Sequence, residues 1–233
     1  REDSIVADIG TDHAYIPIYL HQNNLIKKSY ACDISKGPLE NAVRNIRNYN
    51  LEDSIETRLS NGLEKINIED DVDTIIVAGM GGMLIIDILK AKPEVVEQAD
   101  MLILQPQKSA CSLRKYLHQI NFFIQDDTIL LDDGRYYNII IARNNNKLEY
   151  GEIEEYREVE YMFGRFEIES KTDILKNYLE DEVVRLGKIL DKNNIKIKTS
   201  SEDERSEEQE SDSIRKLKNN YNLHEEVLGE WEK

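Results

Sequence analysis

Residues 5–20 limit the possible folds of this chain more than any other segment. Ile5 to Ile9 is a short β-branched run that stops at Gly10, and an apolar segment with Ile16 and Ile18 follows. This order predicts a buried strand, a tight turn and a helix. A glycine at the turn permits a positive φ and a close approach of the backbone to a ligand. The segment therefore predicts the first strand–turn–helix unit of an α/β domain.

Two carboxylates flank this turn. Asp8 precedes Gly10 and Asp12 follows it, beside the N–H groups that open the predicted helix. They would repel a phosphate and attract a ligand that carries an ammonium and a sulfonium group. A dinucleotide fold needs Gly-x-Gly-x-x-Gly at this place, so the single glycine favours an S-adenosylmethionine site over a dehydrogenase. A structural turn that binds no ligand stays open as the alternative.

A third acid ends the next predicted strand, residues 29–33. Asp33 lies 23 residues after Gly10, and an acid at about this distance accepts hydrogen bonds from the ribose hydroxyls in nucleotide-binding βαβ units. We therefore expect Asp33 to bind a ribose. The alternative role is a cap for the helix that is predicted to run from Ser35 to about Asn50.

Two further turns supply candidates. Asn61 follows the predicted strand 55–59, where it is either a contact for the adenine base or an ordinary turn residue. The buried run 73–78 leads into Gly79-Met80-Gly81-Gly82, and an apolar helix comes next. Three glycines in four residues leave room for a flat base beside a methyl donor, so we expect this loop to be functional.

The remaining strands complete the predicted sheet. Residues 101–104 predict a fifth strand, and residues 122–131 and 135–142 predict a β-hairpin around Asp133-Gly134. An antiparallel hairpin at the end of a parallel sheet gives the strand order 3-2-1-4-5-7-6, which is typical of methyltransferases. The predicted fold of residues 1–147 is therefore an α/β, Rossmann-like, seven-stranded domain.

The pattern changes after Arg143, and residues 148–233 predict a second, all-α domain. Apolar side chains recur every three or four residues at 174–190 and again at 214–231, which indicates two amphipathic helices. The acidic segment 199–213 between them predicts a loop or a frayed helix. The two helices suggest an antiparallel, coiled-coil-like hairpin, which has either a binding role or a packing role alone.

Composition narrows the class of protein. Hydrophobic residues make up 40% of the chain and charged residues 33%, and no apolar run approaches the ~20 residues of a membrane span. Cys32 and Cys111 lie far apart and form no Cys-x-x-Cys motif, so we expect no metal, no disulfide framework and a cytoplasmic location. Because Arg1 lies only four residues before the first strand, we expect further residues upstream in the natural protein.

The net charge of −16 argues against a broadly basic nucleic-acid surface. Acidic residues outnumber basic ones on both sides of residue 145. A nucleic acid would therefore have to bind a local patch. The basic side chains that we expect near phosphates are Lys108, Arg114, Lys115 and Arg135.

Five short motifs occur in a fixed order along the first 142 residues. They are Asp-Ile-Gly-Thr-Asp-His-Ala-Tyr at 8–15, Gly-Pro-Leu-Glu-Asn-Ala at 37–42, Gly-Met-Gly-Gly at 79–82, Leu-Gln-Pro at 104–106 and Asp-Gly-Arg-Tyr-Tyr at 133–137. With this set the chain resembles a bacterial family of tRNA adenine-N1 methyltransferases that modify adenine 22. The resemblance extends to the architecture, a Rossmann-like domain followed by a coiled-coil-like helical domain.

The resemblance implies S-adenosylmethionine as the cofactor and tRNA as the partner, with the helical arm as a candidate tRNA contact. It implies that Asp33 binds the ribose, that Asn61 and Gly62 lie near the adenine, and that Gly79 and Met80 lie near the methionine portion. The full set of implied cofactor-binding residues is Asp8, Gly10, Asp12, His13, Asp33, Asn61, Gly62, Gly79 and Met80.

Methylation of adenine N1 needs no covalent enzyme intermediate, because N1 carries its own lone pair. The enzyme has mainly to hold N1 in line with the methyl group. The methylated base becomes cationic unless N6 loses a proton, so a carboxylate or amide near N6 would stabilise it. The catalytic candidates are Asp12 first and Gln105 second. The alternative for Asp12 is a contact to the cofactor's ammonium or a helix cap, and His13 either donates to the cofactor or only packs.

Reaching N1 inside folded tRNA requires an unstacked base, on which Tyr15, Tyr136 and Tyr137 are candidates to stack. Two other functions stay open. One is methyl transfer to a small molecule or a protein, which suits the acidic charge better. The other is a non-catalytic scaffold that binds the cofactor and docks a partner protein through its helical arm.

Overall fold

The computed structural model describes residues 2–148, 151–193, 195 and 212–231. The chain divides into two compact units, one made of Arg1–Thr128 with Tyr137–Glu155 and the other of Ile129–Tyr136 with Tyr156–Lys233. The tip of the last hairpin thus groups with the helical unit. The domain boundary that the sequence places at residue 147 stays a prediction.

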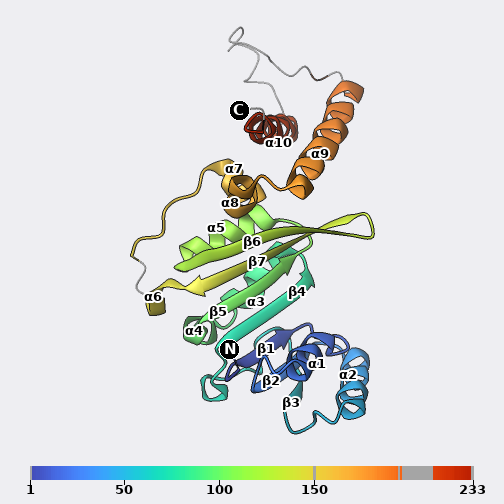
Figure 1. Ribbon diagram of the computed structural model, residues 1–233, viewed down its shortest axis with the longest axis vertical. Helices are drawn as coiled ribbons and strands as arrows, with labels where there is room; N and C mark the ends of the chain where they lie inside the picture. The colour runs from blue at the N-terminus through green and yellow to red at the C-terminus, as the bar shows by residue number, and fades with distance from the viewer. Residues whose placement is uncertain (1, 149–150, 194, 196–211, 232–233) are drawn as a thin grey trace. The chain divides into compact units, whose positions relative to one another are not determined.

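The chain forms a seven-stranded sheet with the order β3-β2-β1-β4-β5-β7-β6 (Figure 1), which belongs to the first unit except for the hairpin tip, Ile129–Tyr136. This is the predicted order. Strands β1 to β5 run parallel, and β7 pairs with β5 in the antiparallel sense. The strands are β1 (Ile5–Ile9), β2 (Lys28–Asp33), β3 (Ile55–Leu59), β4 (Thr74–Met80), β5 (Met101–Pro106), β6 (Phe122–Asp132) and β7 (Arg135–Asn144).

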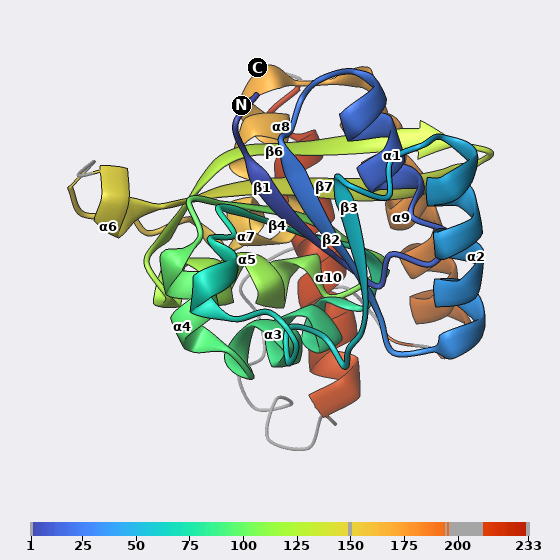
Figure 2. The same cartoon turned by 90° about the horizontal axis from the view of Figure 1, so that it is seen from below.

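Helices cover both faces of the parallel strands (Figures 1 and 2). Helices α1 (Tyr15–Gln22) and α2 (Lys36–Asn48) lie on one face, and α3 (Gly82–Lys90), α4 (Pro93–Gln98) and α5 (Ala110–Gln119) lie on the other. Right-handed crossovers produce this arrangement, because the chain leaves β1 in one direction through β2 and β3 and returns in the other through β4 and β5. Two short elements complete the unit, the 3-10 helix η1 (Ile68–Asp70) and α6 (Asn145–Leu148).

The central strands are buried on both faces, which explains their continuous apolar sequences. Ala7 in β1, Val77 in β4 and Leu102 in β5 have no exposed surface. On the side of α1 and α2 the core consists of small and β-branched residues that fit between helices and sheet. They are Ala14, Ile18, Ala31, Ala42, Ile46 and Ile55.

The strands β4 and β5 each extend two residues further than their apolar runs predict, to Met80 and Pro106. The reason is a register shift between Ala78 and Met80, after which the pairing resumes. Gln105 therefore lies inside β5 rather than in the loop after it.

The expectation that Arg114 lies near phosphates is wrong. Its side chain is completely buried, because it lies on the same face of α5 as Leu113 and Leu117. Its Nε donates to Asp127 Oδ2 at 2.5 Å, and its Nη2 donates to Asp127 Oδ1 at 2.9 Å and to Asn138 Oδ1 at 3.2 Å. Arg114 thus fastens α5 to the β6–β7 hairpin.

The described residues of the helical unit form the helices α7 (Glu158–Phe163), α8 (Arg165–Ser170), α9 (Asp173–Lys192) and α10 (Asp212–Leu228). The two long ones confirm the predicted amphipathic helices, and they pack against each other. The acidic segment 199–213 lies outside the described residues except for Asp212 and Ser213, which begin α10. None of the described helices is long and apolar enough to cross a bilayer.

The tip of the β6–β7 hairpin and the helices of this unit share one hydrophobic core. It consists of Ile129, Val159, Phe163, Ile168, Leu175, Leu179, Leu223 and Val227. The buried carboxylate of Glu167 accepts from Ile129 N at 2.8 Å and from Thr172 Oγ1 at 2.5 Å. Thr172 in turn caps α9 by accepting from Leu175 N at 3.2 Å.

Candidate active site

The candidate site lies where β1, β2 and β4 end. Ile9 pairs with Cys32 on one side and with Val77 on the other, so the carboxyl ends of the three strands are level. The strand order reverses between β1 and β4, which is the position where ligands bind in open α/β sheets. The turns after these strands carry nearly all the predicted site residues.

The turn after β1 has little room for side chains. The backbone N–H groups of Gly10 and Thr11 both donate to Cys32 O at 2.9 Å, which fixes the turn against β2. Gly10 has a φ of +74°, and a Cβ atom there would lie 2.2 Å from Met80 Cε. The structure therefore brings together Gly10 and Met80, two predicted cofactor residues from distant turns.

Two buried acids lie near the carboxyl ends of β1 and β2. Asp33 Oδ2 accepts from Asp12 N at 3.1 Å, and its Oδ1 accepts from Ser35 N at 2.8 Å. Asp8 is 2% exposed, and its Oδ2 accepts from Thr11 Oγ1 at 2.6 Å. Asp33 thus organises both turns, and each of its oxygens keeps a lone pair for a ligand hydroxyl.

Burial raises the pKa of Asp8 to about 6, the Thr11 hydrogen bond opposes this rise and the charge of Asp33 adds to it. A carboxyl group that is desolvated beside a second carboxyl group is stabilised by a cation. An ammonium beside Asp8 would supply that cation, since neither Asp8 nor Asp33 forms an ion pair among the described residues.

Asp12 and His13 lie at the exposed mouth of the same turn. Asp12 adopts a left-handed conformation with a φ of 52°, and its Oδ1 is 3.5 Å from His13 Nε2. The His13 ring lies 5.4 Å from that of Tyr15, which is 66% exposed. Tyr136 belongs to the helical unit, where its ring packs edge-on against Tyr178.

The turn after β3 is joined to Asp33 through its backbone. Ser60 N donates to Asp33 O at 2.8 Å, which brings Asn61 and Gly62 to the end of β2. Asn61 Nδ2 donates to Glu64 Oε1 at 2.9 Å. Gly62 has a φ of +57°, a conformation that favours glycine.

Gly79 and Gln105 meet at the ends of β4 and β5. The bulge in β4 frees Gly79 N, which donates to Gln105 Oε1 at 2.8 Å. A backbone N–H group can only donate, so this contact fixes which end of the Gln105 amide is the oxygen. The opposite end, Nε2, is buried and has no hydrogen-bond partner in the described part of the chain.

The glycines of the loop after β4 have different roles. A Cβ on Gly79 would meet nothing within 4 Å, whereas one on Gly82 would lie 2.6 Å from Ser109 O. Gly82 N donates to Lys108 O at 2.8 Å, so Gly82 is needed for packing between α3 and the turn after β5.

Sequence reasoning missed two contributors. Thr11 holds Asp8, and its position three residues after an acid is a signal that could have identified it. Arg58 on β3 binds the segment that follows Asn61, and only the fold reveals this. No group of three His, Cys, Asp or Glu residues that could hold a metal ion occurs among the described residues.

The chain is similar to proteins of one family. A family model described as tRNA (adenine(22)-N(1))-methyltransferase matches residues 6–222. A curated tRNA (adenine(22)-N(1))-methyltransferase from Bacillus subtilis is 35% identical over 144 residues, which are 62% of this chain and 60% of that relative. The aligned part thus covers less than two thirds of the curated relative's length.

Two solved structures are similar over nearly the whole chain. One is Streptococcus pneumoniae Sp1610, a putative tRNA (m1A22) methyltransferase in complex with S-adenosyl-L-methionine, with a TM-score of 0.80, 27% identity and coverage of 97% of this chain and 92% of that chain. The other is M. capricolum TrmK in complex with S-adenosyl-homocysteine, with a TM-score of 0.78, 31% identity and the same coverage of both chains.

Proposed function

This chain belongs to the tRNA (adenine(22)-N(1))-methyltransferase family, and we propose that it transfers the methyl group of S-adenosylmethionine to N1 of adenine 22 in tRNA. The observation that carries the proposal is the pair of buried acids, Asp8 and Asp33, at the end of two adjacent parallel strands, beside a turn without side chains at Gly10. A cofactor with a ribose and an ammonium fits this set of donors and acceptors.

The residues around the turn bind different parts of the cofactor. Asp33 accepts from the ribose hydroxyls, and Asp8 with Asp12 stabilises the ammonium. Asn61 and Gly62 contact the adenine, since Ser60 joins their turn to Asp33. The methionine portion lies along Gly79, Met80 and His13. When bound, the cofactor supplies a sulfonium methyl group that a nitrogen lone pair can attack.

The chain's own contribution to the reaction is positioning. N1 of the base must lie in line with the methyl group, and holding it there supplies several kcal/mol. Asp12, which is 64% exposed at the mouth, accepts a hydrogen bond from N6 as the base becomes cationic. Gln105 has its oxygen engaged by Gly79 N, so it offers a donor instead. A donor suits N3 or N7 of adenine and does not suit N6.

The tRNA binds through basic side chains of each unit and through the helical arm. Lys108 and Lys115 of the first unit and Arg135 of the second contact phosphates, and the unstacked base stacks on Tyr15, whose ring is largely exposed next to His13. The enzyme works in the cytoplasm, where its two cysteines stay free thiols.

The experiment that tests this proposal is transfer of labelled methyl from S-adenosylmethionine to bulk tRNA, followed by nucleoside analysis. We expect N1-methyladenosine, and we expect it to vanish when adenine 22 is replaced. Asp33→Ala should abolish both cofactor binding and transfer. Label on another nucleoside, or cofactor binding without label on any RNA, would overturn the proposal.

The net charge of −16 favours a second candidate, an S-adenosylmethionine-dependent methyltransferase that acts on a small molecule or a protein. An acidic surface repels RNA and tolerates such acceptors. The labelled cofactor is offered in parallel with tRNA, with a protein-free extract that supplies small molecules and with an RNA-free extract that supplies proteins. The acceptor that takes up the label separates the two candidates.

A further inference from the structure

The segment between β3 and η1 carries Asn61 and Gly62, to which the proposed function assigns the adenine. Its first residue is fixed to the sheet, because Ser60 N donates to Asp33 O at 2.8 Å. Ser60 Oγ closes the next turn by donating to Gly62 O at 2.8 Å and accepting from Lys65 N at 3.1 Å. The position of the turn then depends on what holds its far end at Lys65.

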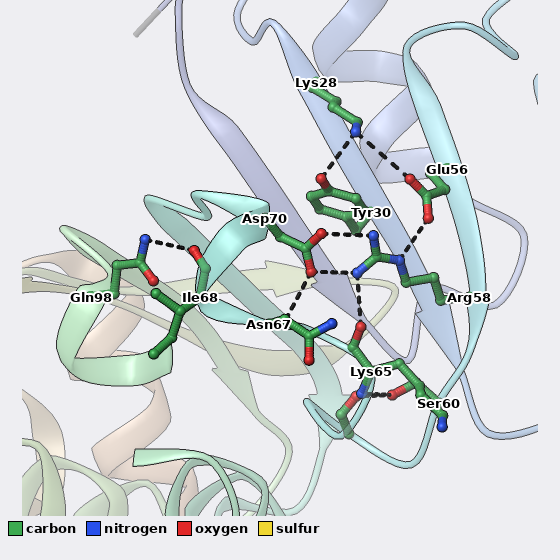
Figure 3. Close-up of polar contacts among 11 residues, drawn as sticks. Lys28, Tyr30, Glu56, Arg58, Ser60, Lys65, Asn67, Ile68, Asp70 and Gln98 are labelled. Carbon is green, nitrogen blue, oxygen red and sulfur yellow. Dashed lines mark hydrogen bonds and ion pairs between the residues drawn. The ribbon is translucent and has the colours of Figure 1, made fainter. Parts of the chain in front are cut away.

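Arg58, on the edge strand β3, holds that far end (Figure 3). Its Nη1 donates to Lys65 O at 2.8 Å. Its guanidinium pairs with Asp70 through Nη1 to Oδ2 at 2.5 Å and Nη2 to Oδ1 at 2.8 Å. Asp70 Oδ2 also accepts from Asn67 N at 2.8 Å, which caps η1. One side chain therefore ties the strand to two points of the segment 60–70.

The guanidinium is held from other sides as well. Its Nε donates to Glu56 Oε1 at 2.8 Å, and its Cζ lies over the Tyr30 ring, 4.0 Å from the centroid. Lys28 Nζ donates to Tyr30 OH at 3.0 Å (Figure 3). Arg58 and Asp70 are only 17% and 13% exposed, so water and salt screen their attraction less than that of a surface pair.

Only arginine satisfies all these partners. A lysine ammonium carries a charge but cannot pair bidentately with Asp70 and stack on Tyr30 at once. The hydrogen bonds from Arg58 hold the pKa of Asp70 down at about 2, although burial opposes this. The Arg58–Asp70 pair is therefore charged at neutral pH.

We propose that Arg58 is a positioning residue for the cofactor, which holds Asn61 and Gly62 at the place beside Asp33 where the adenine binds. This inference rests on the proposed function, since that function assigns the adenine to this segment. Arg58 itself contacts neither cofactor nor tRNA. Its loss should weaken cofactor binding and leave the chemical step unchanged.

The test compares wild type, Arg58→Lys and Arg58→Gln in the full chain. Calorimetry gives the Kd of S-adenosylhomocysteine and of adenosine, and methyl-transfer assays give KM and kcat. For Arg58→Gln we expect both Kd values and the KM for S-adenosylmethionine to rise about tenfold, the size of one lost charge-assisted hydrogen bond. We expect kcat at saturating cofactor and the KM for tRNA to stay within about twofold. The Kd and KM values of Arg58→Lys should lie between those of the wild type and those of Arg58→Gln.

Arg185→Gln is the matched control, because it removes the same charge from a surface ion pair with Glu182 on α9. It should leave both Kd values unchanged. Thermal denaturation separates positioning from stability: a lower Tm with unchanged Kd values would overturn the inference. A weaker S-adenosylhomocysteine complex with unchanged adenosine binding would also overturn it. Wild-type protein that binds neither ligand would instead refute the proposed function.

Discussion

At the scale of single residues, Asp8 links burial to function. Burial raises its pKa from 3.8 to about 6, with the Thr11 hydrogen bond opposing the rise and Asp33 adding to it. A raised folded-state pKa means that the folded protein binds this proton more tightly than the unfolded chain does. The resulting stability is fully present below about pH 4 and is lost as the pH rises through about 6.

Asp8→Asn should therefore increase the free energy of unfolding by roughly 2–3 kcal/mol at about pH 7.5, since one pKa unit corresponds to about 1.4 kcal/mol. It should change little at about pH 4. Cofactor affinity should fall at least about tenfold in the variant. In the wild type it should fall below about pH 6, because the ammonium loses its charged partner.

Urea unfolding at the two pH values and calorimetric titration with S-adenosylhomocysteine measure these effects. Asp53→Asn is the control, because Asp53 is exposed before β3, at the amino ends of the parallel strands and away from the site. A destabilised Asp8→Asn protein with normal affinity would contradict the assignment.

Gln105→Glu separates the two ends of one amide. Glutamate still accepts from Gly79 N but has no donor, so the variant isolates the buried Nε2, whose lack of a partner costs about 1–3 kcal/mol. We expect kcat/KM for tRNA to fall about tenfold or more. With the wild-type enzyme, tRNA that carries 3-deaza- or 7-deaza-adenine at position 22 should show a similar fall in kcat/KM for one of the two analogues. With that analogue, Gln105→Glu should cause no further fall. Fully additive losses with both analogues would exclude a donor role.

Residues whose signal is local could be predicted from the sequence, and those defined by a distant partner could not. Gly10 and Asp33 follow from a strand, a glycine and a spacing along the chain. The contact between Gly79 and Gln105 spans 26 residues and exists only because β4 and β5 align. The roles in cofactor binding and catalysis that the sequence assigns to these residues stay predictions, for Gly10 and Asp33 as well as for Asp12, His13 and Asn61.

At the scale of elements, apolar patterning predicted the strands and the long helices, because β-branched runs and three- to four-residue spacing are explicit in the sequence. It did not predict α4, α7 and α8, which have six residues each and are too short to show a period. It also misassigned Arg114. A basic side chain on an amphipathic helix normally faces water, and the buried Asp127 that reverses this lies on another element.

Arg114→Met should lower the free energy of unfolding by about 3–5 kcal/mol, because it removes the guanidinium that pairs with the buried Asp127 carboxylate through two hydrogen bonds. The double variant Arg114→Met with Asp127→Leu should recover most of this loss, since apolar groups of similar volume replace a buried ion pair with little cost. Guanidinium unfolding of the three proteins tests the expectation. A stable Arg114→Met protein with weakened tRNA binding would restore the phosphate role.

At the scale of the whole molecule, two properties bear on the proposed binding of tRNA: the division of the chain into units and its charge. The hairpin tip could not be assigned to the helical unit from sequence, because the apolar partners of Ile129 come from α7, α8, α9 and α10. The charge is explicit in the composition. A net charge of −16 means that the proposed phosphate contacts come from particular basic side chains and not from a broadly basic surface.

Salt dependence of tRNA binding measures those contacts directly. Lys108 is exposed, and its aliphatic stem lies along Gly81 in the loop after β4. Arg135 is exposed at the start of β7. Each phosphate contact contributes about 0.7–0.9 to the slope of log Kd against log salt concentration, so Lys108→Gln and Arg135→Gln should each reduce the slope by that amount.

The matched control for the salt series is Lys27→Gln, because Lys27 is exposed before β2, at the amino ends of the strands, whereas the site lies at their carboxyl ends. It should leave the slope unchanged. Because the two contacts come from different units, the double variant should lose both contributions. If the slope is small in the wild type, or if Lys27→Gln reduces it as much as the other two variants, the proposed phosphate contacts of Lys108 and Arg135 are refuted. Methyl transfer would then have to depend on base and cofactor contacts alone, and affinity would survive at high salt.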